Sequence, residues 1–192
     1  MLKMLKWFAI VLGVLLLAFV VTGFLLPSSY ALERSILIQA TPEQIHQLVG
    51  DLQRWPEWTP WEEMDPSVET TYGPITTGVG ASQTWTSDSG GGELTFTKFD
   101  PLNGIEYAMS FNGAFPSEGV LRYEVTPTGT QLTWSMSGEM DNFISRYMGL
   151  LMSSMVGPSF ETGLARLKTV AEALPAMDPP MEEEPGSAQA AA

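Results

Sequence analysis

Few residues in this chain have the types and spacing that catalysis would need. The 192 residues include one histidine, His46, and no cysteine. These counts exclude multi-histidine metal sites, cysteine-ligated zinc, iron–sulfur clusters, disulfides and thiol nucleophiles. His46 has polar neighbours in the segment EQIHQ, which predicts a place on a solvated helix face rather than a role as general base. We therefore expect no metal ion, no cofactor and no catalytic residue.

The carboxylates and the glycine run do not form a catalytic motif either. Glu62, Glu63 and Asp65 stand close together and could supply a pair for acid–base chemistry. In a chain with 22 acidic residues, such a group is more often a charged surface. The segment SGGG from Ser89 to Gly92 lacks the lysine and following helix of a phosphate-binding loop, and it predicts a hairpin turn. The spacings of a nucleophile elbow, a zinc protease or a dinucleotide site do not occur.

Aromatic and thioether side chains are the remaining material for a binding site. Between residues 82 and 137 large apolar residues alternate with Thr, Ser, Glu and Arg, which predicts a sheet with one buried face. An apolar cavity with a few polar groups suits small apolar ligands. The candidate lining residues are Trp58, Trp61, Gln83, Trp85, Phe96, Tyr107, Met109, Phe111, Leu121, Tyr123, Trp134, Met136, Met148, Met152, Met155 and Phe160. The alternative is that these side chains simply fill the core.

Two groups within this set have interpretations of their own. Met148, Met152 and Met155 fall on one helical face at spacings i, i+4 and i+7, and flexible thioethers suit either an adaptable binding surface or an irregular core. Trp55, Trp58 and Trp61 are interleaved with prolines. They could form the rim of a cavity or touch the bilayer interface, or they could be a structural plug that closes the open end of the sheet.

The N-terminal segment predicts a membrane anchor. The run from Trp7 to Leu26 is almost wholly apolar, and as a helix it spans roughly 30 Å, the thickness of the hydrocarbon core. Lys3 and Lys6 precede it, which places the N-terminus in the cytoplasm by the positive-inside rule. The alternative is a signal peptide cleaved after Ala31, although the apolar run is longer than a signal peptide requires.

The charge balance restricts the partners of the exported portion. Beyond Pro27, 7 basic side chains (9 minus Lys3 and Lys6) face all 22 acidic ones, which gives 7 − 22 = −15. Such an acidic surface excludes nucleic acid as a partner, because phosphate binding needs clustered lysine and arginine. The expected partners are a hydrophobic small molecule or lipid, and the membrane through the N-terminal helix. Whether a protein partner exists is left open.

Turn signals and periodicity predict the order of the remaining elements. A strand over 32–40 precedes a short helix that Thr41 caps, Pro42 opens and Gly50 ends. The segment 51–66 is too rich in proline for one long helix. Six strands fit between residues 67 and 140. A helical region then runs from a cap at Asp141–Asn142 to about Leu174, with a break or kink at Gly157–Pro158.

Three segments in this order resemble a known family. They are ERSILIQATPEQIHQLVGDLQRWPEWTPW at Glu33 to Trp61, YGPITTGVGASQTW at Tyr72 to Trp85, and GPSFETGLARLKTVAE at Gly157 to Glu172. The chain is similar to membrane-anchored bacterial members of the SRPBCC superfamily (START-like, polyketide cyclase/dehydrase). The resemblance implies an α+β helix-grip fold, in which a curved antiparallel sheet wraps around a long C-terminal helix and encloses a hydrophobic cavity.

These observations lead to one expected organisation. Residues 1–28 form a cytoplasmic stub and transmembrane anchor, 29–175 the START-like domain, and 176–192 a disordered acidic and alanine-rich tail. We expect a single-pass protein of the bacterial inner membrane whose periplasmic domain binds a hydrophobic or amphipathic molecule without chemistry. One alternative is a cyclase or hydrolase acting in the same cavity, with Gln83, Tyr107 and Tyr123 as its polar groups. Another is a scaffold that docks an envelope protein through the tryptophan loop and acidic face.

Overall fold

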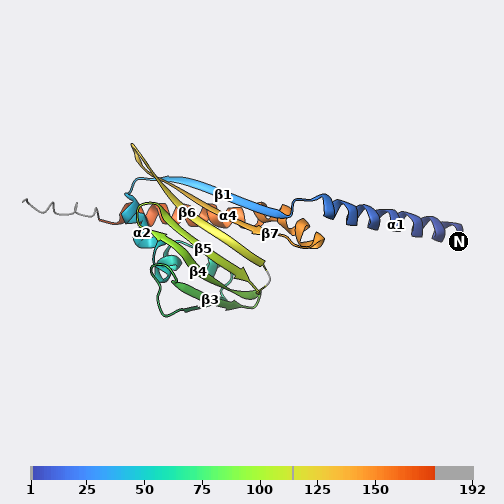
Figure 1. The fold of residues 1–192 in the computed structure, drawn as a ribbon, viewed down its shortest axis with the longest axis horizontal. Coiled ribbons are helices and arrows are strands. Elements are labelled where there is room, and N and C mark those ends of the chain that lie inside the picture. Colours follow the sequence, from blue (N-terminus) through green and yellow to red (C-terminus); the bar gives the residue numbers. More distant parts are fainter. Residues whose placement is uncertain (1, 114, 176–192) are drawn as a thin grey trace, which may run out of the picture.

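The apolar run near the N-terminus forms one helix, α1 (Leu2–Leu25), which extends away from the rest of the molecule in the computed structural model (Figure 1). The structure describes residues 2–113 and 115–175, so the predicted tail at 176–192 lies outside the described residues. Within the described ranges, Lys3–Leu25 is the one helix long and apolar enough to cross a membrane. Length and composition alone do not separate such a helix from a signal sequence.

Seven strands form a single antiparallel sheet in the order β1-β7-β6-β5-β4-β3-β2. The sheet and α4 together make the predicted helix-grip fold, and all six strands expected after the first are present. The first strand starts earlier than predicted, because its pairing with β7 begins at Ser29 opposite Glu139. The strands are β1 (Ser29–Ile38), β2 (Glu69–Tyr72), β3 (Ser82–Ser87), β4 (Gly90–Asp100), β5 (Gly104–Phe111), β6 (Phe115–Thr126) and β7 (Gly129–Glu139).

The predicted alternation of buried and exposed residues holds along most of the sheet. On β6 and β7 the residues assigned to the inner face are buried as far as the strand ends, where Val125 is exposed. Phe111, at the end of β5, is also 37% exposed. A register shift between Phe96 and Lys98 changes the parity of β4. It brings Phe99 opposite Ile105 and onto the inner face, which strict alternation does not predict.

Short helices close one end of the sheet. The helix α2 (Pro42–Val49) begins with the predicted cap at Thr41, whose side chain and that of Gln44 form a capping box, and it ends at Gly50. The proline-rich segment that follows is broken as expected, into a 3₁₀ turn, η1 (Leu52–Glu57), and a single helical turn, α3 (Trp61–Met64). These elements bring the tryptophans of the segment to the inner face of the sheet.

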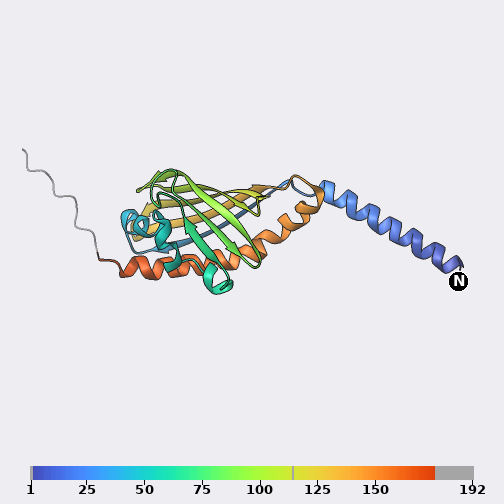
Figure 2. The same ribbon diagram turned by 90° about the horizontal axis from the view of Figure 1, so that it is seen from below.

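The long C-terminal helix, α4 (Phe143–Ala173), begins at a capping box formed by Asn142 and Ser145. The helix is continuous through Pro158, so of the predicted break or kink at Gly157–Pro158 the structure shows the kink. A proline within a helix removes one hydrogen bond and bends the axis, and packing on the sheet after Pro158 holds the rest of the helix in place. Figure 2 shows the resulting bend, which turns the N-terminal half of α4 toward α1.

The bend divides α4 into two halves with different surroundings. In the C-terminal half, Phe160, Leu164 and Leu167 are fully buried against the sheet. In the N-terminal half, Met148 and Met155 are about half exposed, at 46% and 58%. The sheet therefore covers only one half of the helix that it wraps around.

Replacing buried Phe160 by alanine should destabilise the protein by about 3–5 kcal/mol, because the substitution removes apolar contacts and leaves a cavity. The matched substitution Met155→Ala, five residues earlier on the same helix, should change the free energy of unfolding by no more than about 0.5 kcal/mol. Urea denaturation of the full-length protein in detergent measures both. Equal losses of stability would show that the two halves of α4 are packed alike.

Candidate ligand site between the sheet and the C-terminal helix

Aromatic rings fill the space between the C-terminal half of α4 and the sheet. The rings of Trp134 and Phe160 are stacked with their centroids 3.8 Å apart, and Trp58 packs edge-on against Trp134 at 5.3 Å. These three residues and Phe96 are fully buried. They form a packed core in this half of the helix-grip interior.

The two inner-face tyrosines are held within this packed region. The indole Nε1 of Trp134 donates to the hydroxyl of Tyr107 at 3.0 Å. The hydroxyl of Tyr123 forms a hydrogen bond of 3.2 Å with Nδ1 of His46. Burial raises the pKa of both phenols, so both hydroxyls stay neutral at physiological pH. A neutral, buried phenol is a poor general base, and these groups join elements of the core.

The predicted solvated position of His46 is wrong. Its side chain lies on the inner side of α2, where it is 8% exposed and packs edge-on against Phe99 with ring centroids 4.5 Å apart. The polar sequence neighbours are misleading because α2 is covered on most sides. His46 lies three residues before buried Val49 and four after buried Pro42, and this helical spacing is the signal that could have identified it. Desolvation lowers the pKa of His46, and Asp100 opposes the shift in part.

The carboxylates of Glu62 and Glu63 are exposed, as the interpretation of this segment as a charged surface predicts. Glu63 forms a bidentate ion pair with Arg166 of α4. Asp65 accepts hydrogen bonds from Ser67 and Ser89, which lower its pKa to about 2. Glu63 thus links α3 to α4, and Asp65 links its own loop to the turn that contains Ser89. Within residues 2–113 and 115–175, no three His, Asp or Glu side chains lie close enough together to hold a metal ion.

The inner face is different near the N-terminal half of α4. Trp85, Met109 and Met152 are half-buried there and pack against the edge of the core. The ring of Trp85 lies over Gly92, its partner on β4, where a side chain would collide with the indole. This part of the interior presents an apolar surface that is only partly covered, and we call it the open half.

A pair of hydroxyl groups borders the open half. Tyr30 and Ser117 form a buried hydrogen bond of 2.8 Å, and Ser117 is the partner of Met109 across β5 and β6. The sequence did not single out either residue, since Tyr30 lies in the segment that resembled a cleavage site. Its burial depends on the pairing of β1 with β7, which no local pattern indicates.

The sixteen candidate lining residues therefore fall into three groups. Eight are buried in or beside the packed core, five are half-buried and three are exposed. The buried ones are Trp58, Phe96, Tyr107, Leu121, Tyr123, Trp134, Met136 and Phe160. The half-buried ones are Trp61, Gln83, Trp85, Met109 and Met152, and the exposed ones are Phe111, Met148 and Met155. That any of them binds a ligand stays a prediction.

The tryptophan segment behaves as a plug rather than a rim. Trp55 and Trp58 are buried, and their indole nitrogens donate to the carbonyls of Val49 and Leu48 at 2.9 and 3.4 Å. Trp61 is half-buried and packs edge-on against Trp134. Because the first two rings are inside the core, they cannot touch a bilayer.

Two hollows of the described surface lie outside this region. One is lined by the outward-facing side chains of Lys98, Glu106 and Arg122 with the backbone of β5 and β6. The other lies beside Thr41 and Thr130 at the end of β7. Neither lies between α4 and the sheet.

Comparisons with known proteins agree with this architecture. Residues 30–172 match the family described as polyketide cyclase / dehydrase and lipid transport. No curated protein matches the sequence. A solved structure from Rhodobacter sphaeroides is 19% identical over 76% of this chain and 94% of its own, with a TM-score of 0.55. Protein Ms6760 from Mycobacterium smegmatis is 18% identical over 75% and 91%, also with 0.55.

A further solved structure is DynU16, from the dynemicin biosynthetic locus. It is 14% identical to this chain, with a TM-score of 0.54, and the match covers 74% of this chain and 47% of DynU16. At such low identities the similarity of all three structures shows the fold alone.

Stability should fall as the pH is lowered from about 7 to about 5, because His46 is buried in its neutral form. Its pKa in the folded protein lies below the ordinary value of 6.5, so the unfolded chain binds the proton first and is favoured as the pH falls. His46 is the only histidine, which assigns this pH window to one side chain. Urea denaturation at several pH values measures the effect.

The variant His46→Gln is the control for this effect. It keeps a polar group beside Tyr123 but does not titrate, so its stability should be nearly constant over the same pH range. A wild-type protein whose stability is equally constant would show that His46 is not desolvated.

Proposed function

The chain belongs to the polyketide cyclase / dehydrase and lipid transport family, and from this premise we propose that it binds a hydrophobic or amphipathic small molecule without transforming it. The ligand lies in the open half, between Met152 of α4 and the inner face of the sheet. The helix α1 anchors the domain to the membrane, with the N-terminus in the cytoplasm and residues 29–175 in the periplasm.

The observation that carries this proposal is the unequal coverage of the inner face. Trp134 and Phe160 close one half of the interior, whereas Trp85, Met109 and Met152 remain partly exposed in the other. A partly exposed apolar surface inside a fold is costly in water, and such surfaces commonly mark binding sites. A bound apolar molecule would cover it.

The chemistry of the open half suits a ligand that is mostly apolar. Met109 and Met152 can adapt their side chains to different shapes at little cost. Gln83 and the hydroxyl pair of Tyr30 and Ser117 offer neutral hydrogen-bonding groups for a polar end. None of these five side chains carries a charge or a nucleophile activated by a base, which favours binding over catalysis.

Contacts between α1 and α4 support an anchor that is retained. The hydroxyl of Tyr147 donates to the carbonyl of Phe19 at 2.6 Å, and the guanidinium of Arg146 donates to the carbonyl of Phe24 at 2.9 Å. Cleavage after Ala31 would remove both acceptors and leave Tyr147 and Phe143 without their aromatic partners on α1. A signal peptide has no need of such contacts with the mature domain.

Native mass spectrometry of the full-length protein, released from a mild detergent, should show a bound hydrophobic molecule. The substitution Met152→Gln should reduce its affinity about tenfold, because it places an amide against the apolar ligand at a cost near 1–2 kcal/mol. Glutamine preserves the helix propensity of methionine. The neighbouring exposed substitution Ser153→Gln should leave binding unchanged. A protein without a bound molecule, or two variants that bind equally, would contradict the proposed site.

The anchor predicts an unprocessed, membrane-bound chain. Protein isolated from cell membranes should have the full mass of 21.0 kDa and should resist extraction with alkaline carbonate, because the roughly 30 Å apolar helix spans the hydrocarbon core. A soluble product that begins at Leu32 would instead identify the segment as a cleaved signal peptide.

A further inference from the structure

An apolar stripe runs along the N-terminal half of α4 without a partner in the described structure. Ile144, Met148, Leu151 and Met155 follow one another at spacings of four, three and four, which places them on one face of the helix. Their side chains are 59%, 46%, 50% and 58% exposed. Such a row of half-exposed aliphatic and thioether groups on a helix is uncommon on a surface that faces only water.

Charge is also distributed unequally along α4. Residues 143–160 include one charged side chain, Arg146, whereas the thirteen residues from 161 to 173 include four. Arg146 is itself engaged with the carbonyls of Phe24 and Leu26 at the end of α1. The exposed surface of the N-terminal half of α4 is therefore apolar or bears only serine hydroxyls, as a surface in contact with lipid would.

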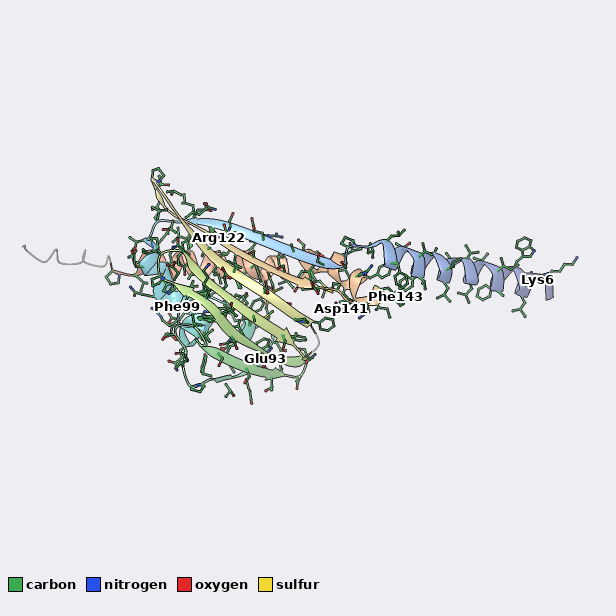
Figure 3. The ribbon with its side chains drawn as sticks, in the orientation of Figure 1. Lys6, Glu93, Phe99, Arg122, Asp141 and Phe143 are labelled. Atoms are coloured by element: carbon green, nitrogen blue, oxygen red, sulfur yellow. The ribbon has the colours of Figure 1, made fainter. Side chains whose placement is uncertain are left out.

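The start of α4 is in contact with the apolar span of α1. Figure 3 shows Phe143 beside the C-terminal end of α1, at the opposite end of that helix from Lys6. The ring of Tyr147 stacks on Phe19 with centroids 4.6 Å apart. Gly23, the one buried residue among residues 3–25, lets the helices approach, since a side chain there would meet Tyr147 and Phe143. Small residues commonly play this part where membrane helices pack.

These contacts set a depth for the start of α4. Phe19 lies six residues before Leu25, the last residue of α1, which corresponds to about 9 Å along the helix axis. The Tyr147 hydroxyl, bonded to the Phe19 carbonyl, therefore lies about 9 Å below the end of the span. Leu150 and Leu151 follow Tyr147 at i+3 and i+4 and share its side of the helix. The exposed stripe thus continues directly from the contact with α1.

We propose that the N-terminal half of α4 lies in the bilayer leaflet nearest the domain, with the apolar stripe among the acyl chains. This inference rests on the proposed anchoring by α1. Figure 2 shows this half of α4 inclined steeply to α1, so it lies along the surface of the leaflet rather than across it. Interfacial helices bury their apolar face roughly 5–10 Å into the leaflet, which agrees with the depth of Tyr147. The partner of the stripe is lipid, and Met152, four residues after Met148, joins the stripe to the open half.

Site-directed labelling tests the inference in the full-length protein, which has no cysteine of its own. An environment-sensitive fluorophore is attached to Met148→Cys, on the stripe, and the protein is reconstituted into phosphatidylcholine–phosphatidylglycerol vesicles. The matched control is Ala165→Cys, an exposed position in the other half of α4. A third label at Leu16→Cys, exposed on α1, reports insertion of the anchor itself.

We expect lipids with a doxyl group near the headgroup to quench the label at Met148, and its emission to shift to the blue, while the label at Ala165 is unaffected. Quenching at Leu16 by lipids with a doxyl group deep in the acyl chain, without quenching at Met148 by the headgroup-near doxyl lipids, would overturn the inference and leave the anchor intact. Absence of quenching at both Met148 and Leu16 would overturn this inference and also the proposed anchoring by α1. A blue shift at Met148 that is insensitive to doxyl lipids would also overturn it, because protein would then cover the stripe.

Discussion

The stacking of Trp134 on Phe160 is the contact on which the rest of the architecture depends. It fixes the position of α4 on the sheet. Trp134 also contacts the rings of Trp58 and Trp61 and donates a hydrogen bond to the hydroxyl of Tyr107. Because the rings of Trp58, Trp134 and Phe160 are large and fully buried, the C-terminal half of the helix can pack on the sheet in few other ways. The bend within α4 then directs its other half away from the sheet and toward α1. A closed core and an open apolar surface thus arise from one helix that is packed along only half of its length.

Much of this fold could be predicted from sequence because its signals are local. The period-two alternation, the turn residues and the caps at Thr41 and Asn142 each act over a few residues. The errors concern positions where distant elements decide the outcome. Polar neighbours suggested that His46 faces water, but α2 is enclosed by the sheet and the turn that follows it. Pro158 suggested a break or a kink, and packing of the following residues on the sheet decides for the kink, because it offsets the one missing hydrogen bond.

The candidate site could be predicted only as a face of the sheet. Alternation shows which residues point inward, but it does not show how far along that face the covering helix extends. Tyr107 and Met109 have the same parity on one strand, yet one is in the packed core and the other borders the open half. The difference comes from how α4 packs on the sheet, and α4 begins more than thirty residues after β5 in the sequence. The pair of Tyr30 and Ser117 was missed for the same reason, since only the pairing of β1 with β7 buries it.

The acidic body of the domain and the nearly uncharged N-terminal half of α4 differ in how they would interact with a membrane surface. The portion beyond Pro27 carries a formal charge of −15, and anionic headgroups repel such a surface over about a Debye length. The N-terminal half of α4 is the exception, with Arg146 as its one charge. In the proposed membrane-bound state, repulsion of the acidic body and burial of the apolar stripe favour the same orientation, in which the start of α4 faces the bilayer. In that orientation the open half lies next to the leaflet, so the proposed ligand would pass between the two without crossing water.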